Sequence, residues 1–101
     1  MVPIEVNDLL DVPSFQKKWP DFKAIDNCTR EKITPDMEVL VRREGEDFRV
    51  KIEEVTGEIL VGKILTEIFY FNQPFQYEDY IKFEKKNVIN IYDINRWGVL
   101  Y

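Results

Sequence analysis

Residues 41–65, which read VRREGEDFRVKIEEVTGEILVGKIL, decide the fold of this chain. From Phe48 to Glu53, apolar and charged residues alternate one by one, which is the period of a half-buried β-strand. Gly45 stands before this run and Gly57 follows it, and glycine supplies the positive φ angle that a tight reversal needs. The stretch therefore predicts a meander of three strands joined by two tight turns.

The later part of the chain predicts one or two further strands. Residues 80–86 (YIKFEKK) alternate again, and residues 88–94 (VINIYDI) predict a strand or a single 3₁₀ turn followed by a strand. The segment 66–79 is expected to continue the third strand to about Phe71 and then to form a loop. Gly62 inside the third strand predicts a bulge or a bend, which a small closed barrel needs. We therefore expect a mainly β protein, a small SH3-like barrel of about five strands. The expected interior residues are Phe48, Val50, Ile52, Ile59, Ile64, Ile81 and Phe83.

The first 36 residues differ from the rest and predict an irregular wrapping segment. Within it, residues 11–19 (DVPSFQKKW) predict a short helix with Asp11 as N-cap and Pro20 as the stop signal. Residues 22–25 (FKAI) predict a short edge strand. The expected organisation is a wrapping segment at 1–36 and a barrel with an apolar C-terminal tail at 37–101.

Turn and core positions at 37–94 resemble a small uncharacterised SH3-like β-barrel family of bacteria, phages and large DNA viruses. The resemblance departs at Glu78, where the family has glycine, and at Arg49, where it often has tryptophan. It implies a barrel fold, no particular activity, and a viral accessory or minor virion component as the setting. The matching positions are Gly45, Glu46, Phe48, Gly57, Gly62, Asp79, Ile81, Phe83, Ile91, Tyr92 and Asp93.

Composition excludes several classes of function. The net charge is −5, from 14 basic and 19 acidic residues, and no segment is a basic arm, which argues against nucleic acid as a partner. The chain has no histidine, so Ser-His and Cys-His relays and the common zinc sites are absent, and Cys28 has no base to activate it. We therefore expect no enzyme activity, no metal and no cofactor.

The location expected from the sequence is the cytoplasm, or the host-cell cytoplasm, with the virion as a further setting. The first residues lack a basic leader with a long apolar run, so we expect no secretion. No stretch reaches the roughly 18 apolar residues of a membrane span.

The first hairpin offers a candidate anion-binding face made of Arg42, Arg49 and Lys51. Neighbouring strands bring facing side chains within about 5 Å, so these cations could hold a phosphate of a nucleic acid. Such a nucleic-acid-binding barrel is the alternative hypothesis. The simpler interpretation is a solvated face on which the basic residues, Arg43 included, pair with carboxylates. The carboxylates expected to serve are Glu44, Glu53 and Glu58.

The main functional hypothesis is a non-catalytic protein-interaction or structural module that binds a protein partner or a second copy of itself. A barrel of this size shelters only part of its aromatic loop, so some rings are expected to face a partner. The apolar C-terminal tail is expected to cover the barrel end or to dock on another chain. The candidate contact residues are Phe69, Tyr70, Phe71, Phe75, Tyr77, Trp97 and Tyr101.

Overall fold

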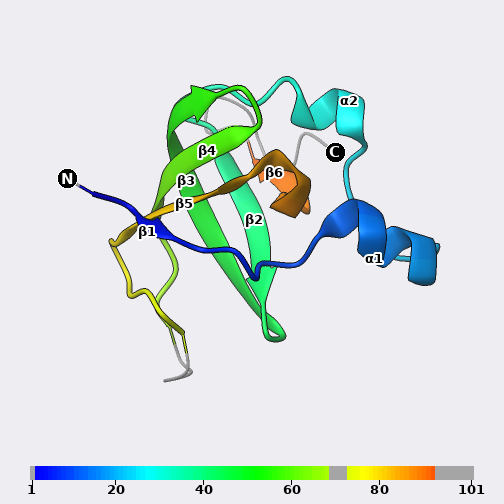
Figure 1. Ribbon diagram of the computed structural model, residues 1–101, viewed down its shortest axis with the longest axis horizontal. Helices are drawn as coiled ribbons and strands as arrows, with labels where there is room; N and C mark the ends of the chain where they lie inside the picture. Colours follow the sequence, from blue (N-terminus) through cyan, green and yellow to red (C-terminus); the bar gives the residue numbers. More distant parts are fainter. Residues whose placement is uncertain (1, 69–72, 93–101) are drawn as a thin grey trace.

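The computed structural model describes residues 2–68 and 73–92 and contains one curved mixed sheet (Figure 1). Its six strands lie in the order β1-β5-β4-β3-β2-β6, and all neighbours are antiparallel except β1 and β5. The strands β2 to β5 form a meander, a 3₁₀ turn follows, and β6 returns to pair with β2. This is the small, mainly β arrangement that the sequence predicted, with six strands where about five were expected. The strands are β1 (Ile4–Glu5), β2 (Glu38–Arg43), β3 (Glu46–Thr56), β4 (Ile59–Ile64), β5 (Tyr80–Glu84) and β6 (Asn90–Tyr92).

Both predicted glycine turns are present. The β2–β3 hairpin closes on the pair Arg43 and Glu46, and the two residues between them, Glu44 and Gly45, have φ angles of 50° and 80°. Two positive φ angles are the requirement of a type I′ turn, whose twist suits a hairpin. In the next hairpin Gly57, with φ of 60°, takes the glycine position of a type II′ turn. Turn chemistry therefore sets the register of β2 against β3, and that of β3 against β4 next to the Gly57 turn.

The bend predicted at Gly62 is also present, but the extra residue lies on the partner strand. The register of β3 against β4 shifts between Ile52 and Glu54, opposite Gly62. A Cβ atom at Gly62 would lie 2.5 Å from Cγ1 of Val50 and 2.7 Å from the carbonyl oxygen of Lys51. Glycine is therefore required here by close approach of the two strands.

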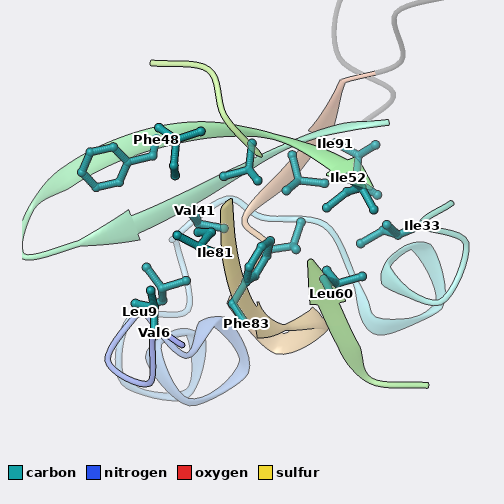
Figure 2. Packing of buried hydrophobic residues seen from close by; sticks show 14 of the residues in the cluster. Val6, Leu9, Ile33, Val41, Phe48, Ile52, Leu60, Ile81, Phe83 and Ile91 are labelled. Carbon is teal, nitrogen blue, oxygen red and sulfur yellow. The ribbon is translucent and has the colours of Figure 1, made fainter. Parts of the chain in front are cut away.

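One apolar core lies inside the curved sheet, and Figure 2 shows side chains from the strands and from the N-terminal segment converging on it. Six of the seven predicted interior residues are buried, but Ile59 is only partly buried, and Leu60 takes its place. The prediction was wrong because Ile59 and Ile64 are an odd number of residues apart, so a regular strand points them to opposite faces.

The N-terminal segment contributes to the same core. Val6, Leu9 and Ile33 are buried among the strand residues (Figure 2). Helix α1 (Val12–Lys18) begins at the predicted N-cap, where a carboxylate oxygen of Asp11 accepts a hydrogen bond from the backbone N–H of Ser14. A second helix, α2 (Asn27–Arg30), was not predicted.

Two predicted strand segments are wrong. Residues 22–25 form no strand, although the N–H of Ile25 donates to the carbonyl of Ile89. Strand β4 ends at Ile64 rather than continuing toward Phe71, and residues 69–72 lie outside the described residues. In residues 22–25 and 65–68 apolar side chains resemble a strand pattern, but the backbone has no continuous partner to pair with.

The 3₁₀ turn η1 (Lys85–Asn87) and the two residues after it hold the N-terminal segment in place. Asn87 donates to the carbonyls of Leu9 and Leu10, and Val88 accepts from Arg30. The described part of the chain contains no helix long and apolar enough to cross a membrane.

Candidate functional site

Each cation of the candidate anion-binding face has a carboxylate within 4 Å. Arg42 donates to both oxygens of Asp47, at 2.5 and 3.3 Å, and this hydrogen bonding raises the pKa of Arg42. Arg49 lies 3.3 Å from Glu38 and 4.3 Å from the centre of the Tyr92 ring. The three basic side chains therefore contact carboxylates of the protein itself and do not converge on a common anion-binding site.

The acidic partners differ from those expected. Lys51 lies 3.9 Å from Asp36, and Arg43, not part of the three-residue candidate face, contacts Glu44 at 3.5 Å. Arg43 also holds Asp8 through two hydrogen bonds, of 2.9 and 2.7 Å, which keep the pKa of the Asp8 carboxyl below its usual range. Only Glu44 had been predicted, since the hairpin register, not proximity in sequence, determines which side chains face each other.

The two described aromatic residues of the predicted contact loop differ in burial: Phe75 is buried and Tyr77 is exposed. The ring of Phe75 is buried and packs edge-on against Phe48, with ring centres 5.0 Å apart. The prediction that Phe75 faces a partner is therefore corrected, because the ring completes the core. Tyr77 is 49% exposed and remains a surface aromatic. The predicted contact residues Phe69, Tyr70, Phe71, Trp97 and Tyr101 lie outside the described residues.

A different aromatic residue, Trp19, is the most exposed large ring among the described residues, at 60%. It follows α1, where its N–H donates to the carbonyl of Phe15 at 2.9 Å. The N–H of Phe22 then donates to the carbonyl of Trp19 at 3.0 Å, which closes a β-turn with Pro20 in the position that proline favours. Gln16 donates to the carbonyl of Phe22, so the turn is bound to the helix.

Around this turn, further aromatic and basic side chains form what we call the Trp19 surface: Lys17, Lys18, Trp19, Phe22 and Lys23. The Phe15 and Phe22 rings meet edge-on with centres 4.8 Å apart, and Arg42 lies over Phe22 at 5.5 Å. In Figure 1, α1, which carries the first part of this surface, stands out to one side of the sheet.

The three lysines of the Trp19 surface are exposed, and none of them forms an ion pair with another residue that the structure describes. Lys32 and Lys82 are the other lysines in residues 2–68 and 73–92 without an ion pair. Residues 17–23 contain these three lysines and one carboxylate, Asp21, so positive charge is in excess beside the exposed tryptophan on a protein whose net charge is −5. Such a local field favours a negatively charged partner.

A cavity of about 280 Å³ adjoins the same surface. Its walls are Phe22, Lys23 and Ala24 from the segment after the turn, and Asn90 from strand β6. The hydrogen bond from Ile25 to Ile89 fixes this segment beside the strand. The cavity has the size and the apolar ring wall to accept one side chain of a partner, with Lys23 on its lining.

Comparisons with family models, curated proteins and solved structures found no match for this chain. The resemblance to the SH3-like barrel family therefore stays a prediction.

Sequence reasoning missed the Trp19 surface because it treated residues 11–20 only as a helix and its stop signal. The signal was present in the order Lys-Lys-Trp-Pro-Asp-Phe-Lys at 17–23. Proline after tryptophan ends the helix, and the turn that follows leaves the ring with no strand or helix to pack against.

Proposed function

We propose that the protein is a non-catalytic interaction module that binds a protein partner through the Trp19 surface. The observation that carries the proposal is the 60% exposure of Trp19 on a turn that three hydrogen bonds hold in place. Tryptophan is enriched among residues that dominate binding energy at protein interfaces. A tryptophan whose backbone is already held in a turn loses less conformational entropy when it is covered than one on a free segment.

The chemistry of the surface favours one class of partner. Lys17, Lys18 and Lys23 supply positive charge without internal partners, and the neighbouring cavity offers Phe22 as an apolar wall. A segment with an apolar or aromatic side chain flanked by Asp or Glu would match both features. The charges would steer the encounter and fix the orientation, while the covered rings would supply most of the affinity.

Binding of single-stranded nucleic acid is the second candidate. It is favoured by one observation, the combination of an exposed ring with unpaired lysines, since bases stack on aromatic rings while cations track the backbone. Two facts make it the weaker candidate. The net charge of −5 repels a polyanion, and Arg42, Arg49 and Lys51 already have carboxylates beside them.

The wider setting belongs to the same proposal. A viral accessory or minor virion role, in the host-cell cytoplasm or the virion, is what the family resemblance implies for such a module. A second copy of the chain as the partner, with Trp97 and Tyr101 of the tail in the contact, is the homo-oligomeric form of the proposal.

A peptide selection tests the proposed surface. The wild-type protein selects from a displayed library of random peptides, with counter-selection against Trp19→Ser. Tyr77→Ser, which removes another exposed aromatic ring, is the matched control. We expect peptides with acidic residues around an apolar anchor that bind wild type and Tyr77→Ser but not Trp19→Ser. Peptides that bind all three proteins equally would contradict the proposal, and single-stranded oligonucleotides that bind through Trp19 when no peptide does would support the second candidate.

A further inference from the structure

A second, unrelated feature lies where α2 meets η1. The side chain of Arg30 is nearly completely buried, with 3% of the residue exposed. Its Nε donates to the carbonyl of Val88 at 2.9 Å, and Nη1 donates to Oδ1 of Asn27 at 2.8 Å. Its Nη2 is buried and has no acceptor among the described residues. Buried polar atoms in folded proteins are almost always satisfied, so an unpaired nitrogen at this place is unusual.

Arg30 also lacks a close counter-ion among the described residues. No carboxylate of the described chain lies within 4 Å of the Arg30 guanidinium. Asp26 and Asp11 act on it only at a distance, while burial lowers the pKa of Arg30. A guanidinium remains charged in a protein, and a buried charge without a close counter-ion is costly.

A cavity of about 340 Å³ adjoins Arg30 and brings further cations to it. Lys85 and Lys86 of η1 line the same cavity, and the side chain of Lys85 is only 7% exposed. The ammonium of Lys85 meets Glu31 at 3.3 Å, and Lys86 is drawn toward Asp11 and Glu84. A buried guanidinium and a buried ammonium therefore lie on one cavity wall, and both groups are donors that suit an oxyanion.

We propose that this cavity binds a phosphate-type oxyanion, as free phosphate or as the phosphate of a monoester. The oxyanion would neutralise Arg30 and accept from Lys85, both of which are already positioned by the fold. Glu31 and Glu58 also line the cavity, and their negative charge weakens the site. This sets a specific expectation, because removing the charge of Glu58 strengthens binding if the ligand is an anion.

Backbone-amide chemical shifts of the full chain, followed during titration with sodium phosphate at constant ionic strength, test the proposal. Sodium chloride and sodium acetate are the control titrations, and phenyl phosphate is the monoester probe. Wild type is expected to show saturable shifts confined to the neighbourhood of 27–31 and 85–88. Lys85→Met should weaken phosphate binding by about tenfold or more, because it removes one of two buried cations. Glu58→Gln should tighten binding about fivefold, the effect expected for about 1 kcal/mol of screened repulsion.

Glu58→Gln keeps the proposal testable if Lys85→Met does not fold, since the Glu58 side chain is exposed and its backbone carbonyl is unchanged. Phenyl phosphate that binds as well as phosphate would assign the cavity to a monoester. Binding of phosphate without binding of phenyl phosphate would assign the cavity to the free phosphate ion. Shifts that do not saturate, or that are the same in wild type and both variants, would mean an adventitious ion only and would overturn the proposal.

Discussion

The guanidinium carbon of Arg42 lies 5.5 Å from the centre of the Phe22 ring, while its nitrogens hold both carboxylate oxygens of Asp47. One side chain therefore joins the first hairpin to the turn that carries Trp19. The sequence predicted Arg42 as a candidate anion ligand. In the structure it packs against Phe22, which is part of the Trp19 surface. The guanidinium of Arg42 contacts the Phe22 ring and the Asp47 carboxylate, so its interactions are made within the protein and not with an external anion.

The Arg42–Asp47 pair should contribute little to stability despite its geometry. The side chains are 33% and 40% exposed, and exposed pairs contribute roughly 0.2–1 kcal/mol. A double-mutant cycle with Arg42→Gln and Asp47→Asn, measured by urea unfolding, should give a coupling free energy below about 1 kcal/mol. A coupling above about 2 kcal/mol would show that the pair acts as a buried one.

Gly62 and Gly45 should respond to alanine for different reasons. At Gly62 the new Cβ would lie 2.5 Å from Val50 Cγ1 and 2.7 Å from a backbone oxygen, so Gly62→Ala should cost about 3 kcal/mol through overpacking. At Gly45 nothing lies within 4 Å, and Gly45→Ala should cost about 1 kcal/mol from the φ angle of 80° alone. Denaturant midpoints of the two variants check this, and equal losses would mean that the strands can separate at Gly62.

Asn87 should be among the most sensitive polar residues of the described chain. Its amide donates to the carbonyls of Leu9 and Leu10, and its oxygen accepts from the N–H of Glu84. Asn87→Ala leaves these buried groups unsatisfied and should cost about 2 kcal/mol. The half-buried Asn90 provides the comparison, since its side-chain oxygen accepts from the adjacent N–H of Ile91 and Asn90→Ala should cost about 1 kcal/mol or less. Hydrogen exchange at residues 9–12 would show whether the N-terminal segment loosens as expected.

Elements with a strong local pattern could be predicted from the sequence, and elements that depend on distant partners could not. Strand β3 and the turns at Gly45 and Gly57 follow from alternation and glycine placement. Strand β1 was missed because a strand of two residues is too short to show an alternating pattern. It forms only because its backbone pairs with β5. The exposure of Trp19 was missed for a similar reason. The burial of a ring depends on which distant residues pack against it, and a local sequence pattern does not predict these residues.

Acid should loosen the N-terminal segment. Hydrogen bonds from Thr29 lower the pKa of Asp26, and the pKa of Asp11 is lowered although burial opposes the shift, because Ser14 and Lys86 favour the ionised form. A carboxyl whose pKa is lower in the folded state stabilises the fold above its unfolded pKa, and that stability is lost as the pH falls through the folded pKa. Protection of residues 11–30 from hydrogen exchange should therefore fall below about pH 3.8, the ordinary value for aspartate.

Asparagine at both caps is the matched control for the acid prediction. Asp11→Asn and Asp26→Asn keep an oxygen that can cap the helix but remove the titrating group. The double variant should show a smaller change in protection between pH 5 and pH 3 than wild type does. An unchanged difference would assign the acid sensitivity to other carboxyls, with Asp8 the first to examine because Arg43 also lowers its pKa.

Affinity capture from the native host, quantified by mass spectrometry in parallel for wild type, Trp19→Ser and Tyr77→Ser, tests the central claim most directly. All three proteins should melt at closely similar temperatures, because both rings are largely exposed. The account predicts a specific protein that wild type and Tyr77→Ser retain and that Trp19→Ser loses by about tenfold or more, as for a residue that dominates an interface. Equal recovery of the same proteins by wild type and Trp19→Ser would contradict the Trp19 surface as the binding site.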